Sequence, residues 1–95
     1  MLLQKNAFRS GASGSSTITV TEPGHGRATG DTVRYRDVAP FDGYTTSTIE
    51  LAAGYTITKV NDDRYSFSVS GETATTGSIQ GGGSVATAGP VTVDA

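Results

Sequence analysis

The sequence predicts an all-β domain, a small antiparallel barrel or sandwich of five to six short strands. Ser, Thr and Gly make up 38 of the 95 residues, whereas Val, Ile, Leu and Phe together make up only 18. Only three of those residues are Leu, and Thr and Gly are poor helix formers, so a helical bundle is excluded. Polar and apolar residues also alternate in several short runs that are separated by Gly, Pro, Asn and Asp.

The clearest strands are runs whose apolar residues share one face. We expect strands at residues 17–21, 32–38, 55–60 and 64–70, and a last short strand at 90–93. The runs 55–60 and 64–70 are joined by a short polar turn and form the strongest hairpin pattern of the chain. The inward-facing residues predict a core that contains Ile18, Val20, Val33, Tyr35, Ile57, Tyr65, Phe67, Val69 and Val91.

Residues 44–54 allow two interpretations. The stretch Ser47-Thr48-Ile49-Glu50 fits a capping box, and Gly54 fits the residue that follows a helix. One or two helical turns at 48–53 are therefore expected on one interpretation. On the other, the stretch is a loop that crosses one end of the sheet.

The two ends of the chain are rich in Gly and Ser. We expect residues 1–16 to form a flexible N-terminal arm, ahead of a single β domain at 17–95 with a Gly-rich loop at 71–89. Leu2, Leu3 and Phe8 would then bury against another subunit. The first residues lack the apolar region of a signal peptide, so we do not expect secretion by that route.

Charge and cysteine content exclude several classes of site. The net charge is −2 and the basic residues are scattered, which argues against direct binding of nucleic acid. There is no Cys and only one His, so we expect no disulfide, no thiolate nucleophile and no metal site. No apolar run reaches the roughly 20 residues of a transmembrane helix, so no membrane span is expected.

The single histidine lies in a turn. His25 is flanked by Gly24 and Gly26, and no spacing in the sequence points to a nucleophile that it would activate. We expect His25, Gly26, Gly30 and Asp31 to be structural turn residues. The run Gly81-Gly82-Gly83-Ser84 lacks the lysine of a phosphate-binding loop. We therefore expect no catalytic residue, no cofactor and no enzyme activity.

Four residues are candidates for an outer surface. Arg34 and Arg36 point away from the core of their strand, where they could pair with the carboxylates of a partner or simply remain solvated and discourage edge pairing. Phe41 and Tyr44 fall in a loop, where aromatic rings could stack on the sugar rings of a surface glycan. These four residues join the three apolar residues of the arm as the predicted interface.

Two segments together resemble a known module. They are Thr17–Val33, which contains His25-Gly26 followed by Thr29-Gly30-Asp31, and Tyr55–Phe67 with its hairpin. The pattern resembles a small β module of structural proteins of tailed bacteriophages and gene transfer agents. That module is often labelled as similar to the first catalytic cysteine half-domain of ubiquitin-activating enzymes, a likeness of shape without ubiquitin chemistry. The run Gly81–Val85 also resembles the segment on the C-terminal side of the module in phage proteins.

The resemblance implies a structural subunit of a phage-like particle, in the neck, tail, fibre-attachment region or capsid surface. Such a subunit would form homo-oligomers, contact other particle proteins and reside in a virion assembled in the bacterial cytoplasm. The alternative function is a stand-alone module that binds a surface glycan. Light scattering separates the two, because a ring or filament favours the first and a glycan-binding monomer favours the second.

Overall fold

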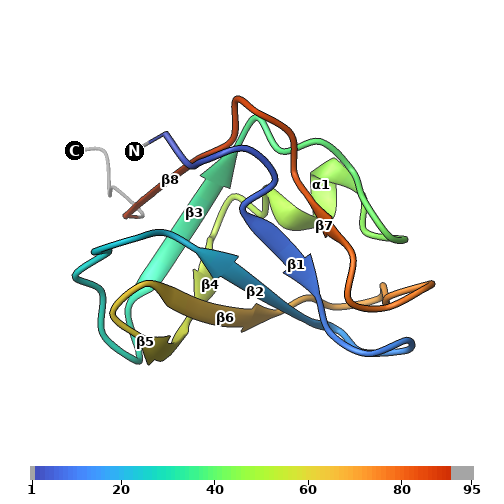
Figure 1. Ribbon diagram of the computed structural model, residues 1–95, viewed down its shortest axis with the longest axis horizontal. Coiled ribbons are helices and arrows are strands. Elements are labelled where there is room, and N and C mark those ends of the chain that lie inside the picture. Colours follow the sequence, from blue (N-terminus) through green and yellow to red (C-terminus); the bar gives the residue numbers. More distant parts are fainter. Residues whose placement is uncertain (1, 91–95) are drawn as a thin grey trace.

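A computed structural model describes residues 2–90, and the predicted core residue Val91 and most of the predicted strand 90–93 lie outside that range. The described residues form eight short strands and one helix of four residues (Figure 1). The elements are β1 (Phe8–Ser10), β2 (Thr17–Thr21), β3 (Thr32–Arg36), α1 (Thr46–Ile49), β4 (Tyr55–Thr56), β5 (Thr58–Asn61), β6 (Arg64–Ser68), β7 (Gln80–Gly81) and β8 (Thr87–Pro90).

The strands form two antiparallel sheets, which confirms the predicted fold class. The five-stranded sheet has the order β5-β6-β2-β1-β7, and the three-stranded sheet has the order β4-β3-β8. The two sheets share a single apolar core. Neither order closes on itself within residues 2–90, so the architecture is a sandwich of open sheets rather than a closed barrel.

The core is built on the register between β2 and β6. Ile18 lies opposite Phe67, and Val20 lies opposite Tyr65. The predicted core residues that the structure describes are all buried, with exposed fractions of at most 6%. The ring of Phe67 stacks on Tyr35 of the other sheet at a centroid distance of 4.7 Å. The alternating pattern therefore predicted the correct inner face of both strands.

The N-terminal segment is part of the sheet, so the prediction of a flexible arm at 1–16 is wrong for the residues described. Strand β1 lies between β2 and β7, with Phe8 paired to Val20 on one side and to Gly81 on the other. Phe8 and Leu3 are buried in the core of their own chain. The residues 11–16 form the connection from β1 to β2, because the N–H of Gly11 donates to the carbonyl of Thr17.

The predicted Gly-rich loop at 71–89 contains two strands. Gly81 in β7 lies against the ring of Phe41, and Gly82 lies against the ring of Phe8. A Cβ atom at either glycine would collide with these rings, so the absence of a side chain is what allows the close approach. The segment therefore packs as part of the domain.

The predicted strand at 55–60 is divided between the two sheets. Tyr55–Thr56 pairs with β3, whereas Thr58–Asn61 pairs with β6 as the predicted hairpin. Ile57 lies at the crossing point, where its N–H donates to the carbonyl of Asp31. A single strand that bends between sheets closes one corner of the sandwich without a separate loop.

The helix is one turn and starts earlier than the capping-box pattern predicts. α1 spans Thr46–Ile49 with Thr45 as N-cap, and no side chain caps its first amides. Glu50 accepts instead from the N–H of Val38 at 3.1 Å, which ties the helix to the end of β3. Because the helix ends at Ile49, the predicted helical turns at 50–53 are absent and Gly54 is not the residue after a helix; with φ of 74° it lies in a separate turn, where its N–H donates to the carbonyl of Leu51.

Candidate functional site

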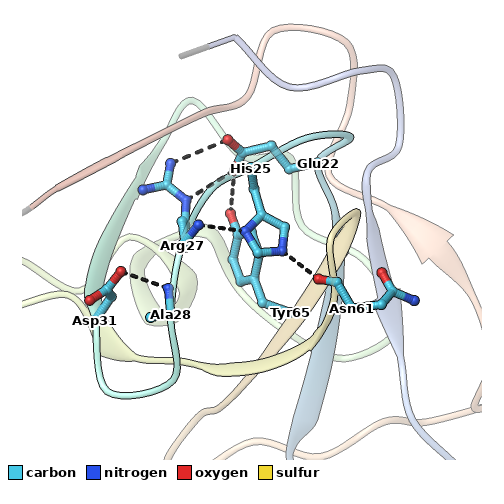
Figure 2. Close-up of polar contacts among 7 residues, drawn as sticks. All are labelled: Glu22, His25, Arg27, Ala28, Asp31, Asn61 and Tyr65. Carbon is cyan, nitrogen blue, oxygen red and sulfur yellow. Dashed lines mark hydrogen bonds and ion pairs between the residues drawn. The ribbon is translucent and has the colours of Figure 1, made fainter.

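The turn after β2 carries a cluster of polar side chains around His25. Both nitrogens of His25 bond to backbone: Nδ1 accepts from the N–H of Arg27 at 2.8 Å, and Nε2 donates to the carbonyl of Asn61 at 2.7 Å (Figure 2). The ring also meets the edge of Tyr65 at 5.1 Å. His25 thus connects the turn to the hairpin of β5 and β6, and neither nitrogen is free to take a proton from a substrate.

Beneath His25 lies a buried carboxylate. Glu22 is only 2% exposed, and its Oε1 accepts from the hydroxyl of Tyr65 at 2.7 Å. The guanidinium of Arg27 contacts both carboxylate oxygens, at 3.2 and 3.3 Å, and lies over the ring of Tyr65 (Figure 2). This two-point ion pair compensates the charge that burial would otherwise make costly.

Burial and hydrogen bonds shift the pKa values of Tyr65, Tyr35 and Arg27. Burial, followed by the hydrogen bond to Glu22, raises the pKa of Tyr65 well above its usual range. Burial also raises the pKa of Tyr35, and the adjacent Tyr65 adds to the effect. For Arg27, burial works to lower the pKa, but the hydrogen bond to Glu22 and the charges around it outweigh burial and raise the pKa. Both phenols therefore stay neutral and Arg27 stays charged at physiological pH.

Sequence reasoning singled out His25 but missed Glu22, Arg27 and the polar role of Tyr65. A signal was present, because the alternation of β2 buries Ile18 and Val20 and therefore points Glu22 inward as well. An acidic residue in phase with a buried face requires a partner. Arg27 is the basic residue that the turn brings back to it.

Of the other predicted turn residues, Gly26 lies next to His25 with φ of 65°, and Gly30 and Asp31 lie in the following tight turn. Oδ2 of Asp31 accepts from the N–H of Ala28 at 2.9 Å, and the N–H of Asp31 donates to the carbonyl of Ala28 at 3.0 Å (Figure 2). Gly30 adopts φ of 97°, a conformation that costs other residues energy, and its N–H donates to Ile57. These contacts set the entry into β3.

The predicted interface residues do not form one surface. Tyr44 is 1% exposed and its hydroxyl donates to the carbonyl of Ser15, so it belongs to the core, as Leu3 and Phe8 do. These three were predicted as interface because the sequence shows apolar side chains without showing that they fill one sandwich. The ring of Phe41 is partly buried and packs between Phe8 and Tyr44.

Three of the predicted interface residues remain at the surface. Leu2 and Arg36 are exposed, and Arg34 is half-buried on the outer side of β3. Residues 2–90 contain no group of three His, Asp or Glu side chains placed to hold a metal ion. Within the same range, no helix has the length and apolar character that crossing a membrane requires.

Comparison with known proteins gives a match in structure and none in sequence. No protein-family model and no curated protein matches the chain. The fold is similar to part of a solved structure named Phage phi92 endosialidase, with a TM-score of 0.67 and 20% sequence identity. The match covers 95% of this chain and 12% of the endosialidase chain. The similarity is therefore one of fold, between this domain and a small part of a much longer phage protein.

Proposed function

We propose that this chain is a non-enzymatic structural component of a phage-like particle, located in the neck, tail, fibre-attachment region or capsid surface. The observation that carries the proposal is the shared fold with part of a phage protein, which extends over 95% of the present chain. A small β sandwich that recurs as one piece of a larger phage protein is suited to serve as a building block. The protein would reside in the virion after assembly in the bacterial cytoplasm.

The geometry of the polar cluster supports the absence of enzyme activity. His25 bonds to backbone through both nitrogens, Tyr65 bonds to Glu22, and Glu22 also pairs with Arg27. A general base must reach a substrate proton, whereas Glu22 is buried and both nitrogens of His25 are already bonded. The cluster instead connects the turn, β5 and β6 into one rigid end of the sandwich.

Contacts with other copies or particle proteins would use the apolar side chains that remain exposed. Leu2 is 63% exposed and Val85 is 62% exposed. Leu2 forms a bridge with Thr87, so the two apolar side chains lie on adjoining segments near β8. A domain of this size gains stability when it buries such groups in an oligomer.

The test is incorporation into particles. Particles purified by density gradient from a lysate should contain the chain at a constant ratio to the major structural proteins, as measured by quantitative mass spectrometry. The double variant Leu2→Asp and Val85→Asp should remain folded and lose this association, whereas Leu51→Asp, an exposed residue elsewhere, should retain it. Recovery of the wild-type chain only in the soluble fraction would contradict the proposal.

A glycan-binding module remains the second candidate function. The predicted pair of Phe41 and Tyr44 does not support it, because the ring of Tyr44 is buried and that of Phe41 is partly buried against it. The outer face of the five-stranded sheet does offer a polar pocket, and the fold neighbour is named an endosialidase. If the chain binds a glycan, we therefore expect the site on that face of the sheet and not in the loop that contains Phe41 and Tyr44.

A further inference from the structure

The outer face of the five-stranded sheet carries a shallow pocket of about 250 Å³. Its lining is polar apart from two aliphatic residues, and it consists of Ala7, Arg9, Thr19, Thr21, Val60, Arg64 and Gln80. The pocket lies on the side of the sheet opposite the core, because the alternate residues Phe8, Ile18, Val20 and Tyr65 point inward. None of these lining residues belongs to the cluster around His25.

The register of the sheet brings two arginines to this pocket from opposite sides. Arg9 on β1 lies opposite Thr19 of β2, and Arg64 on β6 lies opposite Thr21. Both arginines therefore flank β2 with an offset of two residues, which places their Cα atoms roughly 12 Å apart for ordinary strand spacing. Side chains as long as arginine can reach one anion from both sides across that distance.

Both guanidinium groups are free to bind a ligand. Neither has a hydrogen bond or an ion pair with another side chain among residues 2–90. The acidic residues nearest to Arg64 along the chain are engaged elsewhere: Asp62 pairs with Lys59 at 3.1 Å, and Asp63 accepts from the N–H of Gly24 at 3.1 Å. The acidic residue nearest to Arg9 along the chain is Glu22, which pairs with Arg27. Two uncompensated cations thus share one pocket in a chain whose net charge is −2.

We propose that this pocket binds a carboxylate-bearing sugar unit of an acidic glycan. The planar guanidinium groups of Arg9 and Arg64 match a carboxylate, with which arginine forms paired hydrogen bonds. The hydroxyls of Thr19 and Thr21 and the amide of Gln80 donate and accept, as the hydroxyls of a sugar require. A pocket of about 250 Å³ is smaller than most sites for drug-sized ligands and suits one sugar ring rather than an extended chain.

The same face is poorly suited to nucleic acid. Proteins that bind single strands stack bases on aromatic side chains and follow the backbone with a line of cations. The pocket lining contains no aromatic residue and only two arginines. An anionic sugar can bind to both features that are present: the two arginines contact its carboxylate, and the hydroxyls of Thr19 and Thr21 contact its own hydroxyls.

Two-dimensional NMR titration of the full chain tests the proposal. The probes are an oligomer of sialic acid and a hyaluronan hexasaccharide, with maltohexaose as the neutral control and a short DNA strand as the phosphate control. Both carboxylated probes should shift the amide signals of β1, β2 and β6, and binding should weaken as salt is added. The neutral hexasaccharide and the DNA should bind at least about tenfold more weakly.

Three matched variants locate the site. Arg9→Gln and Arg64→Gln should each weaken binding by about tenfold, because each removes a charged hydrogen-bond donor pair. Arg36→Gln, which removes an exposed arginine from the other sheet, should leave affinity within about twofold of wild type. Because all three side chains lie at the surface, thermal unfolding should be nearly unchanged and serves as the check on folding.

Three results with the sugar probes and the arginine variants would overturn the inference. They are no shift with either carboxylated probe, equal affinity for maltohexaose, and an equal loss on Arg36→Gln. Tighter binding of the DNA strand would assign the pocket to phosphate instead and would also overturn it. The inference does not depend on particle incorporation, because a chain absent from particles can still bind the sugar, and a particle subunit can lack this affinity.

Discussion

The turn after β2 and the contact between β1 and β7 are stabilised in opposite ways. In the turn, His25 and Glu22 bond to Arg27 nearby in the sequence and also to Asn61 and Tyr65 of the β5–β6 hairpin. At β1, Phe8 fills a space that Gly82 leaves open because it lacks a Cβ atom. The first arrangement is held by directional polar contacts, some of them within the turn, whereas the second depends on the fit of two surfaces that are 74 residues apart in the sequence.

The largest expected effect comes from removing β1. Deleting residues 2–10 should abolish cooperative unfolding, because it removes Phe8 from the core and leaves β2 and β7 without their common neighbour. A small domain has only about 5–15 kcal/mol of stability to lose. Circular dichroism during thermal unfolding measures the result, and Leu2→Ser, at an exposed position, is the control that should melt like wild type.

A truncated chain that still melts cooperatively near the wild-type midpoint would support the prediction that residues 1–16 form a flexible arm. It would show that β1 only rests on a sheet that is complete without it.

The packing of Gly82 provides the next largest effect. Gly82→Ala should destabilise by about 2–4 kcal/mol, since the new methyl group meets the ring of Phe8 and φ is positive. Gly24→Ala is the matched control, because Gly24 also has a positive φ but has open space around it. The control should lose only about 1–2 kcal/mol in urea unfolding.

Equal losses in the two glycine variants would contradict the packing argument. They would assign the whole effect at Gly82 to backbone strain.

A substitution in the turn after β2 should cost less stability than Gly82→Ala. His25→Asn removes the ring that connects Arg27 to Asn61 and should cost about 1–2 kcal/mol of unfolding free energy. The buried pair of Glu22 and Arg27 stays in place and holds the turn. The same urea titration measures the change, and a loss as large as that of Gly82→Ala would show that the histidine ring, rather than the ion pair, organises this end.

Most of the fold is predictable because strands β2, β3 and β6 carry their own pattern. Ile18, Tyr35 and Phe67 each alternate with polar neighbours, so the buried face can be read from a few consecutive residues. The turn residues His25 and Asp31 are predictable for the same reason, since glycine and polar residues define a turn locally.

The remaining strands could not be predicted, because they are too short to show a pattern. β1 has three residues and β7 has two, and both lie in segments whose Gly and Ser content indicates a linker. Their pairing depends on Phe8 meeting Gly81 and Gly82, which is a matter of shape rather than of local preference. The pocket with Arg9 and Arg64 could not be predicted either, because Arg9 faces that pocket only when β1 pairs in the sheet.

The smallest expected effect is a dependence on pH at the loop after β3. The hydrogen bond from the hydroxyl of Ser10, followed by those from the amides of Thr76 and Gly77, lowers the pKa of Asp42. A lowered folded-state pKa adds stability above the unfolded-state pKa, and that stability is lost as pH falls through the folded-state value.

Asp42→Asn should therefore be less stable than wild type at about pH 7, and the difference should shrink by about pH 3. Thermal midpoints at both pH values measure this change. A difference that stays constant between them would show that the carboxylate charge has no part in holding β1 to the loop.

The central claim is that β1 is an inner strand, since both the core and the arginine pocket depend on it. Amide hydrogen exchange of the native protein tests it most directly at Phe8, Arg9 and Ser10. We expect the hydrogen-bonded amides of β1 to be protected to the same degree as those of Ile18 and Val20 and to open only with global unfolding. Rapid exchange throughout 8–10, with β2 still protected, would contradict the account.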